Sequence, residues 1–226
     1  MQLLDYAAVP GVAECRLDDK TLASLPANEA PAPWDCDLSA VLWWARAGAA
    51  ARAAAADVLA GGGAPLAVIG GLVSYANTPV GGYHEVLGAI ALRRGKDVVA
   101  TVPFMAVDST RSLVGGRGNW SLPKSLARFR GEPGAGTASA AGAGWSVSVS
   151  ARPFGPRFPV AAKGRLVQPW PDGAHRAARL AGRSRARLAV VTVAVESDAD
   201  LPAWLRPGRH LGAVLSQTRF TLSESQ

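Results

Sequence analysis

A single lysine in an apolar setting is the residue best suited to covalent chemistry. Lys124 follows Trp120, Leu122 and Pro123, and it is one of only four lysines among 24 basic residues. A guanidinium stays protonated and cannot form an imine, whereas a lysine amine can lose its proton and attack a carbonyl carbon. Burial disfavours the ammonium form and lowers its pKa. Lys124 is therefore either an activated nucleophile or an ordinary surface lysine.

Two other charged side chains lie in glycine-rich segments. Glu85 is the only acidic residue between Val58 and Lys96, and it either forms a structural ion pair or faces a polar cavity as a proton-transfer group. Arg117 is flanked by glycines. Its planar guanidinium can hold a substrate carboxylate or pair with Glu85. The residues alone leave these alternatives open.

The common catalytic and cofactor-binding motifs are absent from the sequence. It has no GxSxG elbow, no Walker A phosphate loop, no GxGxxG fingerprint after a strand and no HExxH zinc motif. The three histidines and the cysteines at 15 and 36 are too scattered to form a metal site. We therefore expect neither a cofactor nor a metal.

Short apolar segments separated by glycine and proline are expected to supply most of the secondary structure. Residues 45–60 are rich in alanine and predict a helix, and residues 38–46 belong either to that helix or to a separate buried strand. Residues 122–130 predict a short helix with Pro123 near its first turn. The strand candidates are Leu66–Ile69, Leu72–Tyr75, Tyr83–Leu92, Val98–Asp108, Trp145–Ala151, Gly164–Val167, Leu188–Glu196 and Ala213–Leu222.

These elements favour one α+β, mainly β domain that spans residues 1–226. Prolines interrupt residues 1–33, which we expect to form an ordered N-terminal arm. Residues 131–144 are rich in glycine and alanine and predict a flexible loop.

Composition argues against disorder and against a membrane-spanning helix. Hydrophobic residues make up 49% of the chain and charged residues 18%. The N-terminus has neither the basic nor the apolar region of a secretory signal. The longest uncharged run, residues 58–83, contains seven glycines and two prolines, which disfavour a spanning helix. We expect a cytoplasmic protein without a membrane partner.

The chain carries a net charge of +7 and an arginine cluster at residues 176–187. Such a cluster can contact phosphates, but no aromatic residue lies within it and no nucleic-acid motif precedes it. We expect a solvated face and no nucleic-acid partner. A basic interaction protein is the alternative.

Three ordered blocks of residues resemble the acetoacetate decarboxylase superfamily. They are YANTPVGGYHE at Tyr75–Glu85, VPFMAVD at Val102–Asp108 and GRGNWSLPK at Gly116–Lys124. The match in order and spacing covers about residues 66–130, and weaker similarity extends toward both ends of the chain.

The resemblance implies a cone-shaped antiparallel β-barrel with small flanking helices, and a homo-oligomer. It implies that Lys124 forms a Schiff base with a β-keto acid, whose protonated imine accepts the electron pair released by departing carbon dioxide. It also implies that Glu85 and Arg117 belong to the active site. The residues that we expect around the substrate are Tyr83, Phe104, Trp120 and Leu122.

The sequence departs from the family pattern beside the lysine. Acetoacetate decarboxylases carry two adjacent lysines, whereas Ser125 follows Lys124 here. Desolvation alone is then left to lower the pKa of the amine. Gly118 and Asn119 stand where the family often has a glutamate and an apolar residue, which leaves the substrate open.

The leading hypothesis is a cofactor-independent Schiff-base lyase that acts on a small β-keto acid through Lys124. The first alternative is a Schiff-base aldolase or dehydratase that acts on pyruvate-type substrates. The second is a non-catalytic module of the same fold that binds a small carboxylate.

Overall fold

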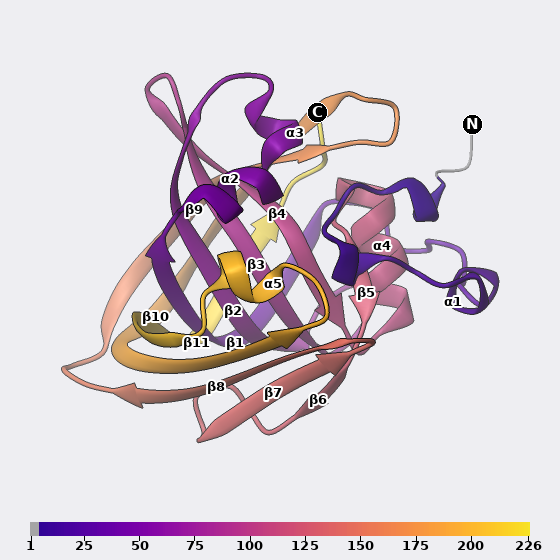
Figure 1. Cartoon of the computed structure of the whole chain (residues 1–226). Coiled ribbons are helices and arrows are strands. Elements are labelled where there is room, and N and C mark those ends of the chain that lie inside the picture. The colour runs from indigo at the N-terminus through magenta and orange to yellow at the C-terminus, as the bar shows by residue number, and fades with distance from the viewer. Residues whose placement is uncertain (1–4) are drawn as a thin grey trace.

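Strands dominate the protein (Figure 1). The structure is a computed structural model that describes residues 5–226, without the side chain of Ala162. The strands are β1 (Trp34–Arg46), β2 (Ala64–Asn77), β3 (Tyr83–Arg94), β4 (Asp97–Val107), β5 (Lys124–Leu126), β6 (Arg128–Arg130), β7 (Thr137–Gly142), β8 (Trp145–Pro153), β9 (Phe158–Pro169), β10 (His175–Ser197) and β11 (Gly208–Leu222). The expected mainly β class is confirmed.

The helices are short. They are η1 (Tyr6–Ala8), η2 (Ala13–Cys15), α1 (Asp19–Ala23), α2 (Ala49–Ala54), α3 (Ala56–Leu59), α4 (Thr110–Trp120) and α5 (Leu201–Leu205). In the part of the chain that the structure describes, none has the length and apolar character needed to cross a membrane.

Seven strands of the sheet close into a ring in the order β11-β1-β2-β3-β4-β9-β10 (Figure 1). The ring closes because β10 pairs with β11 as well as with β9. Its neighbouring strands are antiparallel except for β4 and β9, which meet in parallel at Ala100 and Leu166. The second half of β10 pairs with β8, from which β7 and β6 extend the sheet away from the ring.

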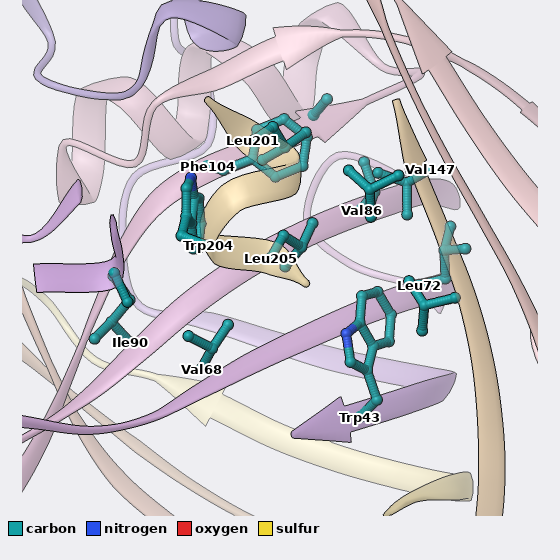
Figure 2. Close-up of a cluster of buried hydrophobic side chains, with 14 of the residues drawn as sticks. Trp43, Val68, Leu72, Val86, Ile90, Phe104, Val147, Leu201, Trp204 and Leu205 are labelled. Carbon is teal, nitrogen blue, oxygen red and sulfur yellow. The ribbon is translucent and has the colours of Figure 1, made fainter. Parts of the chain in front are cut away.

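Side-chain alternation along the ring strands divides the core in two. On β4, Phe104 and Ala106 belong to an outer core, whereas Met105 and Val107 belong to an inner core. The outer core joins the ring to β8, to the second half of β10 and to helix α5, which contributes Trp204 (Figure 2). The inner core surrounds a cavity to which all seven ring strands contribute. Residues that face this cavity are the ones that the ring brings together.

Glycine makes β2 continuous where the sequence predicts two short strands. The segments 66–69 and 72–75 join through Gly70 and Gly71 into one strand. A Cβ at Gly70 would lie 2.1 Å from the ring of Trp43. The glycines therefore allow β1 to pack closely against β2, and they do not interrupt the strand.

The largest differences from the sequence prediction lie between residues 110 and 144. The prediction of a helix at 122–130 is wrong. The helix of this region is α4, which ends at Trp120, and residues 122–130 contain β5 and β6. The segment 131–144 contains strand β7 and is not entirely a loop.

The alanine-rich region also differs from its prediction. Residues 38–46 belong to strand β1, which settles the choice between helix and strand. The single helix expected over 45–60 is replaced by the short helices α2 and α3, which follow that strand.

Candidate active site

Lys124 is placed by the turn between α4 and β5. Helix α4 ends at Trp120 and is capped by Ser121, whose φ of 53° is left-handed. The Leu122 amide donates back to the Gly116 carbonyl at 3.1 Å. Strand β5 then pairs in parallel with β4, so that Lys124 lies beside Met105. This pairing directs the amine into the ring.

Two glycines let α4 pass close to this amine. A Cβ at Gly116 would lie 2.5 Å from Lys124 Cδ, and one at Gly115 would lie 2.4 Å from the ring of Trp34. Real Cβ atoms do not approach other heavy atoms so closely. The Gly115–Gly116 pair therefore gives the lysine its packed position against the helix.

The amine of Lys124 is buried among polar side chains. Its Nζ atom lies 2.8 Å from Glu85 Oε2, 2.9 Å from Ser112 Oγ and 3.4 Å from the Tyr83 hydroxyl. The hydroxyl of Tyr75 donates to Glu85 Oε1 at 3.2 Å. Lys124 is 3% exposed and Glu85 is 2% exposed. Strands β2, β3 and β5 and helix α4 thus assemble a buried ion pair within a hydrogen-bond network.

The ion pair decides the charge of the resting amine. Burial by itself lowers the pKa of Lys124, but the adjacent Glu85 carboxylate and the Tyr83 hydroxyl outweigh it and raise this pKa above its ordinary value. Burial raises the pKa of Tyr83 to about 12. The expectation that desolvation keeps the amine uncharged is therefore wrong for the resting site, because a carboxylate lies within hydrogen-bond distance.

Arg117 contacts backbone and lies outside the cavity lining. Its Nε donates to the Lys124 carbonyl at 2.7 Å, and its two terminal nitrogens donate to the carbonyls of Cys15 and Tyr6. Burial lowers its pKa to about 10. Neither expected role fits, because the guanidinium contacts neither Glu85 nor the cavity. Arg117 is instead a positioning residue, since it ties the lysine strand to the N-terminal arm.

The side chain of Ser125 points to the opposite face of β5 from that of Lys124. Successive residues on a strand point to opposite faces, so Ser125 points away from the amine. Its hydroxyl faces the backbone carbonyls of Glu14 and Met105. A second lysine at position 125 would therefore face these carbonyls and not the Lys124 amine.

A cavity of about 460 Å³ inside the ring reaches Lys124 and Glu85. The expected residues Tyr83, Trp120 and Leu122 lie on its lining.

Phe104 does not line the cavity, which corrects our expectation. It is fully buried in the outer core, where its ring packs edge-on against Trp145 at 5.0 Å between centroids. Val102 and Met105 both line the cavity although they are three residues apart. An irregularity in the β3–β4 pairing between these two positions shifts the alternation by one residue. The side chain of 104 therefore points outward and that of 105 inward.

Sequence reasoning missed two members of the network, Tyr75 and Ser112. A signal for Tyr75 was present, because Tyr83 and Glu85 are two residues apart on one strand and Tyr75 pairs with Tyr83 across the β2–β3 hairpin. Their rings stack at 4.4 Å. Ser112 had no such signal, because its helix was not predicted.

No metal site is evident among residues 5–226. The structure holds no group of three or more histidine, cysteine, aspartate or glutamate side chains in this range that could bind a metal ion.

Comparisons with known proteins show which folds and which family the chain is similar to. Among solved structures, the enduracididine biosynthesis enzyme MppR, in complex with the condensation product of pyruvate and imidazole 4-carboxaldehyde, is 18% identical with a TM-score of 0.59, over 88% of this chain and 90% of that chain. An acetoacetate decarboxylase from Legionella pneumophila is 14% identical with a TM-score of 0.54, over 90% of this chain and 92% of that chain. A further acetoacetate decarboxylase structure is 11% identical with a TM-score of 0.61, over 93% and 97% of the two chains.

No curated protein matched the sequence. The family model described as acetoacetate decarboxylase matches residues 52–152, and this range includes Glu85, Ser112 and Lys124. Residues 52–152 therefore match the acetoacetate decarboxylase family, and the chain shares its fold with the solved acetoacetate decarboxylase structures.

Proposed function

We propose that the protein is a Schiff-base lyase that decarboxylates a β-keto acid through Lys124. The observation that carries this proposal is the buried Lys124–Glu85 pair, 2.8 Å apart, on the lining of the cavity inside the ring. Imine chemistry needs an amine nucleophile and a base within hydrogen-bond reach of it. The pair supplies both.

The first step moves a proton from the Lys124 ammonium to Glu85. Burial disfavours the ammonium form of Lys124, and transfer of its proton to the adjacent carboxylate removes both charges from the buried site at once. The proton travels along one existing hydrogen bond. A hydrogen bond from Tyr75 holds the carboxylate in place during this exchange.

The neutral amine then attacks the carbonyl carbon of the keto acid and forms a carbon–nitrogen bond. The carbonyl oxygen leaves as water with both hydrogens of the amine, and Glu85 returns its proton to the imine nitrogen. The bond to the carboxylate carbon breaks, carbon dioxide departs, and the electron pair moves toward nitrogen to give an enamine. Proton addition at carbon and hydrolysis release the ketone and regenerate Lys124. The apolar lining favours the step that removes the carboxylate charge.

A Schiff-base aldolase or dehydratase is the second candidate. The observation that favours it is the structural similarity to MppR, which is described with a condensation product of pyruvate and an aldehyde. The iminium that pyruvate forms with Lys124 would lose a methyl proton to a base such as Glu85, and the resulting enamine, which keeps its carboxylate, would attack the aldehyde carbon. The two candidates differ in their products and share the lysine.

Reductive trapping tests the proposed function. Cyanoborohydride, which reduces an iminium to a secondary amine, is added with acetoacetate, acetopyruvate or pyruvate. We expect an added mass on the peptide that contains Lys124, and release of carbon dioxide and acetone from acetoacetate without the reductant. Lys96→Ala, in the exposed β3–β4 turn, is the matched control and should behave as the unchanged protein does.

Two other outcomes are informative. An adduct without carbon dioxide, together with a condensation product from pyruvate and an aldehyde, would favour the aldolase. The absence of an adduct with every acid would contradict both enzymatic candidates and favour the carboxylate-binding module. The homo-oligomer, the cytoplasmic location and the solvated arginine face stay predictions.

A further inference from the structure

The cavity is larger than a small β-keto acid needs. Its volume of about 460 Å³ corresponds to roughly fifteen water-sized groups at ~30 Å³ each, whereas acetoacetate has seven non-hydrogen atoms. A ligand of that size would leave much of the space unfilled. The size of the cavity therefore points to a longer substrate.

Two strand pairings mark the ends of this space. Lys124 pairs with Met105, and Leu166 pairs with Ala100, and all four residues line the cavity. Ala100 precedes Met105 by five positions on β4, a separation of about 15 Å along a strand. The cavity thus extends along β4 from the lysine to β9.

The lining between these ends is apolar. Apart from the Lys124–Glu85 pair, its charged members are Lys163 and Arg165, both exposed on β9. Every exposed residue of the described lining lies between positions 161 and 165 of β9, so the cavity opens there. The apolar lining residues from five other strands include Leu38, Leu42, Val73, Leu87, Val102 and Leu215.

We propose that the substrate is a keto acid with an extended apolar substituent, such as an acyl chain of several carbons or an aryl group. This inference rests on the proposed imine chemistry at Lys124. The carbonyl carbon reaches the amine, and the substituent occupies the space between Lys124 and Ala100. Lys163 and Arg165 attract the anionic acid to the opening. Burial of the substituent supplies binding energy that the few polar groups of the lining do not.

The test is reductive trapping over a series of increasing chain length. Acetoacetate, 3-oxohexanoate, 3-oxooctanoate and benzoylacetate are compared by the concentration that gives half-maximal labelling of Lys124 with cyanoborohydride. We expect this concentration to fall about threefold for each added methylene, which is somewhat less than full burial of each group would give. If every acid gave half-maximal labelling at the same concentration, the proposed apolar subsite would be contradicted, whereas the imine chemistry at Lys124 would still be supported. Labelling by none would overturn both.

A variant at the far end of the cavity locates the substituent. Ala100→Leu adds bulk there, and it should raise the half-labelling concentration at least tenfold more for 3-oxododecanoate, whose substituent is long enough to approach this end, than for acetoacetate. Val98→Leu, two residues earlier on the same strand, is exposed and outside the lining, and it should change neither. Equal weakening of the short and the long acid by Ala100→Leu would overturn the proposed position. The series on the unchanged protein decides the question if this variant does not fold.

Discussion

Replacement of Lys124 by alanine is expected to lower keto-acid turnover by a factor on the order of a thousand or more, because it removes the nucleophile of the covalent pathway. No neighbouring lysine can take over, since position 125 is a serine that faces away. Turnover is measured by carbon dioxide release. Turnover within tenfold of the unchanged protein would contradict the assigned role.

A second variant separates lost chemistry from lost folding. Lys124→Ala leaves Glu85 buried without its partner, and breaking a buried ion pair in this way costs about 3–5 kcal/mol. The double variant Lys124→Met, Glu85→Gln removes both charges and should unfold at a temperature closer to that of the unchanged protein. A folded double variant that still releases carbon dioxide at the original rate would exclude Lys124 as the nucleophile.

Replacement of Glu85 by glutamine is expected to reverse the direction of the Lys124 pKa shift. In the unchanged protein the carboxylate outweighs burial and raises this pKa, so an added acylating reagent meets the unreactive ammonium form up to a higher pH than at an ordinary lysine. Without the carboxylate, burial dominates and the pKa falls below its ordinary value, in the direction known for buried lysines. The pH at which an acylating reagent half-maximally labels Lys124 should therefore fall from above the ordinary lysine range to below it. Mass spectrometry of the Lys124 peptide measures this pH.

The same variant should also lower turnover by about a hundredfold, because a general base typically contributes that much or more. A lower lysine pKa combined with slower turnover would identify Glu85 as a proton-transfer group and not only an ion-pair partner. Glu132→Gln, on an exposed residue outside the cavity lining, is the matched control. An unchanged labelling profile in Glu85→Gln would contradict the assigned cause of the pKa shift.

The part of the site on the β2–β3 hairpin could be predicted from the sequence. Tyr83 and Glu85 are two residues apart on an apolar segment, so a strand places them on one face. The apolar residues before Lys124 indicated that it could be buried, but they left a surface lysine open as the alternative. What the sequence could not supply was the distance between Glu85 and Lys124, which depends on the pairing of β5 with β4. That distance reverses the expected direction of the lysine pKa.

The α4 side of the site could not be predicted for a physical reason. The helix contains Gly115, Gly116 and Gly118, and glycine disfavours helices by about 1 kcal/mol relative to alanine. Its support comes from packing against Trp34 and Lys124, which is visible only after folding. Ser112 was therefore missed, and Arg117 was assigned to the cavity although it contacts backbone.

Exchange of the carbonyl oxygen of acetone with heavy-oxygen water tests the central claim most directly. Each cycle of imine formation and hydrolysis on Lys124 releases the original oxygen as water and takes a new one from the solvent. The account predicts that the unchanged protein accelerates this exchange and that the Lys124→Met, Glu85→Gln double variant does not. Exchange at the uncatalysed rate with the unchanged protein, or equal acceleration by the double variant, would contradict it.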